Sequence, residues 1–330
     1  MSRTIRGRSV AALFIAAGLG ISACAAGEAH AGQTVLISGS STVAPITELV
    51  AREGGFDVEI SAEGTTDGFQ RFCTGQTDVN NASEAIPGEG QPLDLLSLCQ
   101  ENEVEFIELP IGIDTLTVVR HLDNEFAASM TMDELQEVWA PDSEVTTWSQ
   151  IRPEWPDEEI ELAGRPPGSG TFDYFTHHVV GQTGEIRDDY FATDDLDELM
   201  DWVAEHENAL AFMGIGNYYS AGDDESREEV STVSVDGVVP TLENAQNGSY
   251  PLTRPLFIYV SVQALEEKSS VGEFVEHYLE NTHETLPRTF FYRLPGDAYE
   301  SVQQRYEDTV TGSLYEGDPF RAESVTELLR

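Results

Sequence analysis

The stretch GRPPGSGT (164–171) combines a glycine-rich turn with one arginine and two small hydroxyl side chains. It follows the short β-prone segment IELA (160–163) and precedes FDYF (172–175), whose apolar spacing is typical of a helix. A turn that opens a helix presents free backbone N–H groups, and Ser, Thr and Arg side chains add further donors. The stretch is therefore a candidate oxyanion site, although GSGT also occurs as a plain helix N-cap.

Three earlier segments show the same change from a β-prone run to a polar turn. They are TVLIS (34–38) before GSST (39–42), VEISA (58–62) before EGTTDG (63–68), and TDVN (77–80) before NASE (81–84). Such strands, alternating with helical segments, predict an α/β fold whose turns share one edge of a sheet. Ligands of these folds bind beyond the carboxyl ends of the strands. N-capping explains each turn separately, but together with GSGT the turns favour one shared site.

Two β-rich stretches are placed where the chain would cross between domains. Residues 105–110 and 115–119 predict two strands with a crossing near 111–114, and YPLTRPLFIYV (250–260) is a β-rich run punctuated by prolines. The expected fold is therefore α/β with an inserted second domain and a ligand cleft between two lobes. The predicted lobes are residues 33–112 plus 255–330, which form a discontinuous first lobe, and residues 113–254.

The N-terminus has the features of an export signal. Three arginines within the first eight residues precede the apolar run 10–21, which is too short to span a bilayer. Cleavage after AHA (29–31) would make residues 1–31 a signal peptide, whereas ISAC (21–24) is a lipobox that would leave Cys24 lipidated. Both alternatives place the folded protein outside the cytoplasmic membrane, in a periplasmic or equivalent extracytoplasmic space.

The chain has 3 cysteines, and Cys24 belongs to the export signal. The remaining two, Cys73 and Cys99, would then fold in an oxidising compartment, which favours a disulfide between them over the alternative of two buried thiols. In the chain-entropy model such a bridge stabilises the fold by about 3–4 kcal/mol.

The charge balance is strongly acidic, with 17 Lys+Arg against 60 Asp+Glu and a formal net charge of -43. Lys268 is the only lysine. This balance argues against nucleic acid and anionic membrane surfaces as partners. The acids are scattered along the chain, and 40% of the residues are hydrophobic, so a folded protein with a solvated acidic surface is expected. From composition alone, we predict a protein that works in concentrated salt.

Several segments together resemble the phosphate-binding proteins of phosphate-specific ABC importers, in the periplasmic-binding-protein superfamily. In chain order they are ISGSSTVAPIT (37–47), EGTTDGFQRFCTGQTDV (63–79), NNASEAIP (80–87), TWSQIRPEWP (147–156), GSGTFDYFT (168–176), ALAFMGIGNYY (209–219) and YPLTRPLFIYV (250–260). The resemblance implies two α/β lobes that close on one inorganic phosphate ion and delivery of that ion to ABC permease subunits in the membrane. It also implies a monomer without catalysis and without a cofactor.

The resemblance assigns phosphate-binding residues turn by turn. They are Ser41, Thr42 and Val43 in the first turn, Thr65 in the second, Ser83 and Glu84 in the third, and Arg165, Ser169, Gly170 and Thr171 around the glycine-rich turn. The arginine would supply charge and a bidentate fork, and the turns would supply neutral donors. Many relatives have, in place of Pro167, an aspartate that braces the arginine. The Arg165 side chain therefore needs another acid or a backbone carbonyl to orient it.

Glu84 departs from the pattern of the family and leaves two alternatives open. Well-known members have an aspartate near this position, and many in the branch that this chain resembles have an arginine. If Glu84 points into the site, it can accept a hydrogen bond from the proton that phosphate keeps at neutral pH, and it would repel sulfate, which has none. If it points outward, it is one more surface acid, and only Ser83 contributes.

Other functions compete with phosphate import. The chain lacks a Gly-Lys-Ser/Thr P-loop, a G-x-S-x-G elbow and an H-E-x-x-H motif, and it offers no evident nucleophile with a base and no metal-ligand set, which argues against a phosphatase-like hydrolase. The adjacent His177 and His178 lie on a presumed helix, where we expect that they cannot both face one site. A binder of sulfate, molybdate or tungstate remains an alternative, as does a phosphate sensor or buffer without transport.

Overall fold

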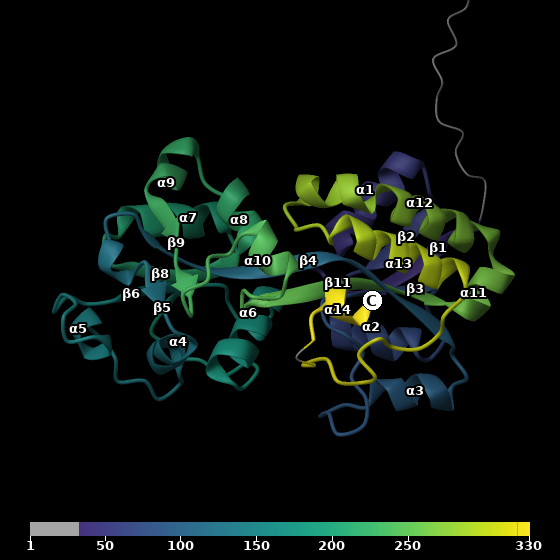
Figure 1. Cartoon of the computed structure of the whole chain (residues 1–330), viewed down its shortest axis with the longest axis horizontal. Coiled ribbons are helices and arrows are strands. Elements are labelled where there is room, and N and C mark those ends of the chain that lie inside the picture. Colours follow the sequence, from purple (N-terminus) through teal and green to yellow (C-terminus); the bar gives the residue numbers. More distant parts are fainter. Residues whose placement is uncertain (1–32, 322) are drawn as a thin grey trace, which may run out of the picture.

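The computed structural model describes residues 33–321 and 323–330, so the proposed export signal and Cys24 lie outside the described residues. The described chain forms a mixed α/β molecule with two lobes (Figure 1). In this part of the chain no helix is long and apolar enough to cross a membrane.

One curled sheet runs through both lobes. Over the described residues its strands follow the order β2-β1-β3-β11-β4-β8-β6-β7, and β9 also pairs with β4. The strand bounds are β1 Val35–Gly39, β2 Val58–Ser61, β3 Val79–Ala82, β4 Phe106–His121, β6 Glu161–Gly164, β7 Phe191–Ala192, β8 Ala209–Gly214, β9 Val230–Thr232 and β11 Thr253–Ser261. A separate small ribbon pairs β5 (Ser129–Met130) with β10 (Ser234–Val235).

The long strands β4 and β11 connect the lobes (Figure 1). The first part of β4 pairs antiparallel with β11, and its second part, from Leu116, pairs with β8. The sequence-based prediction of two separate strands here is wrong, because β4 is one buried strand of 16 residues. Pro110, which has no N–H to donate, lies where the register between β4 and β11 shifts, so a local irregularity accommodates it without ending the strand. The predicted lobe boundaries, after residues 112 and 254, fall inside these two strands.

The first lobe surrounds the parallel strands β2, β1 and β3, whose polar turns follow their carboxyl ends as expected for an α/β unit. Its helices are α1 Ala44–Gly54, α2 Thr65–Phe72, α3 Leu95–Glu101, α11 Val262–Glu267, α12 Ser269–Thr285, η3 Leu286–Thr289, α13 Gly296–Glu307 and α14 Val325–Leu328. One buried apolar cluster gathers around α1 and α12, and a second gathers around Phe69, Phe72 and Tyr259. Burial of these clusters on the faces of the sheet fixes the positions of the turns.

The second lobe is built on β8, β6 and β7, with β8 parallel to β6. Its helices are η1 Glu125–Ala127, α4 Met132–Trp139, α5 Trp148–Ile151, α6 Gly170–Phe175, η2 Thr176–Val180, α7 Leu196–Glu205, α8 Ile215–Ser220, α9 Asp224–Glu228 and α10 Leu242–Gln246. Trp139, Phe175 and Phe212 pack against one another in its core, with Phe175 and Phe212 stacked at 4.0 Å between ring centroids. This packing anchors α6, the helix that follows the GSGT turn.

A C-terminal arm, defined here as residues 313–321 and 323–330, runs along the first lobe and reaches the second. The N–H of Leu314 donates to the buried carboxylate of Glu108 (2.9 Å), and the N–H of Gly88 donates to the carbonyl of Gly317 (2.8 Å). Further along, the hydroxyl of Thr326 donates to the carbonyl of Gln246 in α10 (3.2 Å). The Phe320 ring of the arm stacks on His177 of η2 in the second lobe, with 4.0 Å between ring centroids, so the arm contacts both lobes.

The predicted disulfide is confirmed. Cys73 at the end of α2 is bonded to Cys99 in α3, both residues are buried, and their Cα atoms lie 4.2 Å apart. The bridge joins the end of α2, the helix that begins with Thr65, to α3. It therefore links two neighbouring helices of the first lobe.

We expect the Cys73→Ser/Cys99→Ser double variant to lose about 3–4 kcal/mol of unfolding free energy, because the unfolded chain is no longer cross-linked over this loop. Denaturant unfolding of the oxidised wild type and of the variant would measure the loss. Reduced wild type is the matched control and should unfold like the variant. Equal midpoints for all three proteins would contradict a stabilising bridge.

Candidate functional site

A cleft of about 530 Å³ opens between the polar turns of the first lobe and the start of α6. It is much larger than the roughly 30 Å³ that one water molecule occupies in the liquid, so a small oxyanion fits inside it. Its walls combine polar turns, carboxylates, one arginine and a few apolar side chains. The residues are Ser40, Ser41, Thr42, Glu63, Gly64, Thr65, Thr66, Asp67, Ser83, Glu84, Pro87, Gln91, Pro92, Leu93, Gly168, Gly170, Asp173, Tyr174, His177, His178, Thr183, Arg254, Pro319 and Phe320.

The turn after β1 supplies the first group of predicted residues. Gly39 has a φ of +113°, and a Cβ there would lie 2.1 Å from the carbonyl oxygen of Asn81, so only glycine lets β1 and β3 approach so closely. The Thr42 N–H donates to the Ser40 hydroxyl (3.2 Å), and Ser41 and Thr42 line the cleft. Val43 is fully buried at the N-cap of α1 and does not line the cleft.

The second and third turns meet as the sequence predicted. The hydroxyls of Thr65 and Ser83 lie 3.2 Å apart, and the Ser83 N–H also donates to the Thr65 hydroxyl (3.2 Å). Both residues line the cleft, with Thr65 at the start of α2 and Ser83 directly after β3. The fold therefore brings hydroxyl groups from three separate turns of the first lobe to one cleft.

Glu84 lines the cleft, and of the two orientations left open by the sequence this is the inward one. Burial raises the pKa of its carboxyl above the ordinary value, the charge of Arg254 opposes that rise, and the nearby Asp173 adds to it. Burial also raises the pKa of Asp173. Two carboxyls with a raised affinity for protons thus lie beside the Arg254 guanidinium.

Only some residues of the glycine-rich turn line the cleft. Gly170 lines the cleft, whereas Arg165, Ser169 and Thr171 are not among the residues that do. Arg165 donates from Nη1 to the carbonyl of Asp194 (2.7 Å) and from Nη2 to the Asp194 carboxylate (3.0 Å), and its Nε lies 3.4 Å from the Ser169 hydroxyl. Asp194 thus orients the Arg165 side chain through both its carboxylate and its backbone carbonyl. It takes the place of the aspartate that many relatives have where this chain has Pro167.

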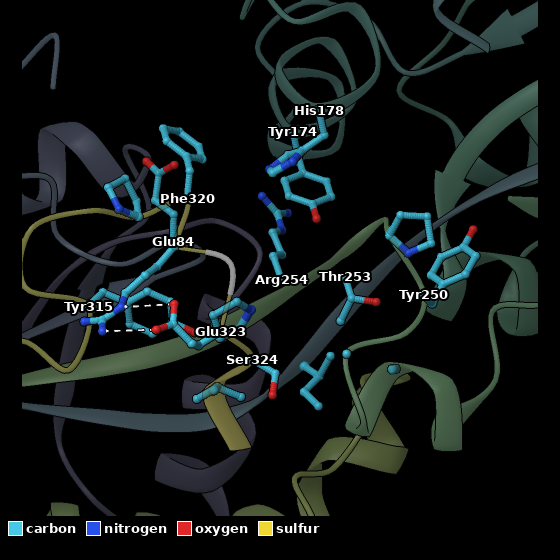
Figure 2. A pocket seen from close by; sticks show the side chains of 18 of the residues that line it. Glu84, Tyr174, His178, Tyr250, Thr253, Arg254, Tyr315, Phe320, Glu323 and Ser324 are labelled. Atoms are coloured by element: carbon cyan, nitrogen blue, oxygen red, sulfur yellow. Dashed lines mark hydrogen bonds and ion pairs between the residues drawn. The ribbon is translucent and has the colours of Figure 1, made fainter. Parts of the chain in front are cut away.

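Arg254 also lines the cleft, although no sequence pattern indicated it as a site residue. This side chain rises from the beginning of β11 into the cleft, where its guanidinium lies 4.7 Å above the ring of Tyr174 (Figure 2). Its Nε and Nη2 both contact Oδ2 of the buried Asp114 at 2.9 Å. The arginine stands in YPLTRPLFIYV (250–260), a stretch used for the crossing between lobes and for the family resemblance. No ligand role was assigned to it, because nothing in the local sequence shows which way its side chain points.

The two adjacent histidines both line the cleft, which contradicts the expectation that they cannot face one site. They lie in η2, a π-helical turn, whose wider backbone separates neighbouring side chains by a smaller angle than an α-helix does. The His177 ring stacks on Phe320 of the C-terminal arm at 4.0 Å, and the His178 ring lies 4.1 Å from Tyr174. Burial lowers the pKa of His178 to about 3, so its ring is neutral near neutral pH.

A smaller cavity of about 230 Å³ adjoins the cleft on the side of the C-terminal arm. Figure 2 shows Arg254 and Glu84 at the border, with Tyr250 and Thr253 on one side and Tyr315 and Glu323 on the other. Across the described ranges, no group of three or more His, Cys, Asp or Glu side chains is arranged to hold a metal ion. The chemistry that the cleft offers is hydrogen bonding to a small anion by hydroxyls, backbone N–H groups and one guanidinium.

Comparison with known proteins agrees with this geometry. Residues 25–280 match the PBP superfamily domain. The Protein SphX of Synechocystis sp. is 35% identical, and the alignment covers 100% of this chain and 97% of that protein. The phosphate-binding protein PstS of Staphylococcus saprophyticus is 30% identical, with 82% of this chain and 84% of that protein covered.

Solved structures are similar as well. A possible phosphate-binding protein from Planctomyces limnophilus is 33% identical with a TM-score of 0.72, and the match covers 84% of this chain and 99% of that one. An ABC-type phosphate transport receptor from Vibrio cholerae, at 20% identity and a TM-score of 0.63 over 79% of this chain and 100% of that one, shares the fold. The matches span both lobes and the cleft between them, and the chain therefore belongs to the PBP superfamily and, within it, to the family of phosphate-binding receptors of ABC importers.

Proposed function

We propose that the protein binds one inorganic phosphate ion in the cleft and delivers it to the permease subunits of an ABC importer. The observation that carries this proposal is the convergence of Thr42, Thr65 and Ser83, from three turns of the first lobe, on the same cleft as Gly170 of the second. Relatives named as phosphate-binding proteins support it. As a member of a receptor family, the protein acts outside the cytoplasmic membrane and as a binding protein rather than an enzyme.

The proposed binding set keeps all the residues that the sequence assigned. Ser41, Thr42, Thr65, Ser83 and Gly170 line the cleft, and the backbone of Val43 and the start of α6 flank it. Arg165, Ser169 and Thr171 would join the ion as the lobes 33–112 plus 255–330 and 113–254 close. A monomer suffices for this function, because both walls of the cleft come from one chain.

Glu84 gives the proposed site its selectivity. Its carboxyl faces the cleft beside neutral hydroxyl donors, so a proton kept by phosphate has an acceptor there. Sulfate carries no proton at neutral pH, and it would leave this carboxylate facing a second negative charge. The same argument disfavours molybdate and tungstate as ligands.

Titration calorimetry of the mature protein should show heat with phosphate and none with sulfate. Phosphate binding should strengthen from low salt to about 1 M NaCl, where the Debye length is about 3 Å, because the net charge of -43 then no longer repels the incoming anion. Absence of phosphate heat at any salt concentration, from protein shown to be folded by circular dichroism, would overturn the proposed ligand.

The Glu84→Gln variant should bind sulfate at least about tenfold more tightly than the wild type, because the neutral amide can donate a hydrogen bond where the carboxylate repels. Competition between sulfate and phosphate, followed by calorimetry, measures the change. Glu89→Gln is the matched control, since Glu89 is exposed in the same loop and does not line the cleft. Unchanged selectivity in Glu84→Gln would remove Glu84 from the selectivity mechanism.

Sulfate rejection by the wild type should weaken on acidification. Burial raises the pKa of the Glu84 carboxyl. On acidification this carboxyl therefore takes up its proton, and becomes neutral, at a higher pH than an exposed glutamate does. A protonated Glu84 can then donate to sulfate, and the apparent sulfate affinity should rise towards that of Glu84→Gln. A sulfate affinity that is the same at neutral and acidic pH would contradict this mechanism.

A further inference from the structure

We propose that Arg254 is a second cationic phosphate ligand, which binds the ion from the hinge between the lobes and so links binding to lobe closure. The proposal rests on the proposed function and goes beyond it, because the sequence assigned only one arginine, Arg165, to the ligand. It begins from the hydrogen bonds of the Arg254 guanidinium.

The N–H donors on one edge of this guanidinium contact Asp114, whereas those on the other edge have no partner at a normal hydrogen-bond distance. A guanidinium has five N–H donors, and contacts from Nε and Nη2 to Asp114 at 2.9 Å use two of them. The remaining donors have only long contacts, from Nη1 to the carbonyl of Gly170 and from Nη2 to the hydroxyl of Thr42, both at 3.4 Å. Arg254 is 8% exposed, so water does not freely replace these missing partners.

A purely structural arginine in the same molecule has different surroundings. Arg187 is similarly buried, pairs with Asp189, and donates from Nη1 to the carbonyls of Val138 (2.9 Å) and Val145 (2.8 Å). Its donors end on protein atoms at normal hydrogen-bond distances. Arg254 instead directs its free donors at the cleft, between the Glu84 side and the Tyr174 side (Figure 2).

The electrostatics of the cleft require a cation at this place. Among the described residues that line the cleft, Arg254 is the only arginine or lysine, while Glu63, Asp67, Glu84 and Asp173 are acids. The other candidate, Arg165, is engaged by Asp194. A phosphate ion seated at the hydroxyls of the first lobe would therefore depend on Arg254 for charge compensation.

The position of Arg254 also explains how binding reaches both lobes. Arg254 and Asp114 are register partners in the pairing of β11 with β4, so the guanidinium is fixed to the strands that connect the lobes. Its two long contacts go to Thr42 in the first lobe and Gly170 in the second. An anion that accepts from the free donors lies between these turns and draws them together.

The test compares three variants with the wild type, with phosphate affinity measured by calorimetry and folding by thermal unfolding. Arg254→Met should lose about 10- to 100-fold in phosphate affinity, as expected for a charge-assisted hydrogen bond. Arg254→Lys keeps the charge beside Asp114 but loses the planar fork, so it should recover part of the affinity. Arg187→Met is the matched control, and it should lower the unfolding midpoint while leaving phosphate affinity unchanged.

Measuring phosphate affinity over a range of pH separates a ligand role of Arg254 from a purely structural one. Phosphate carries more negative charge above neutral pH than below it, so the loss of phosphate affinity in Arg254→Met should be larger on the alkaline side. If Arg254→Met does not fold, the uncharged polar variant Arg254→Gln takes its place, and wild-type affinity in folded Arg254→Gln would overturn the proposal. Affinity equal to the wild type in folded Arg254→Met would also overturn it. Neither result affects the proposed function, which fails only if the wild type itself does not bind phosphate.

Discussion

The antiparallel pairing of β4 with β11 is the constraint on which the rest of the structure depends. Strand β4 belongs to both lobes, since it continues from its pairing with β11 into a pairing with β8. Its buried side chains contribute to the cores of both lobes. The same pairing places Arg254 opposite Asp114 and so positions the cation of the cleft. Fold and site therefore share one set of backbone hydrogen bonds.

Much of the site could be predicted from the sequence, because its information is local. A β-prone run, a polar turn and a helix start within a few residues of one another, and parallel strands place such turns at one edge. This local pattern located the turns, and the resemblance to the phosphate-binding family then assigned Thr42, Thr65, Ser83 and Gly170, which all line the cleft. The disulfide followed from the number of cysteines and the compartment.

The features that the sequence did not reveal depend on long-range contacts or unusual backbone. The continuity of β4 past Pro110 depends on a register irregularity opposite a strand far along the chain. The role of Arg254 depends on Asp114, which is 140 residues away in sequence. The common orientation of His177 and His178 results from a π-helical turn, and periodicity arguments assume the spacing of an α-helix.

Acidic side chains are found both on the surface and in the cleft. The acids that give the chain its net charge of -43 are spread along the sequence, and four of them line the cleft, where hydroxyls, backbone N–H groups and Arg254 are the groups that can hold an anion. Salt at about 1 M screens charges over about 3 Å but leaves direct hydrogen bonds in place. A strongly acidic protein can therefore bind an anion, provided that the contacts are short and the surrounding solution is rich in ions.

The order in which the cleft is assembled has a consequence for the timing of biosynthesis. Its hydroxyl groups lie near the beginning of the chain, but Arg254 and the Phe320 ring of the C-terminal arm, which stacks on His177, are made late. Because chains emerge from the ribosome N-terminus first, a nascent chain has the neutral donors long before it has the cation and the closing arm. The cleft is therefore complete only when nearly the whole chain has been made.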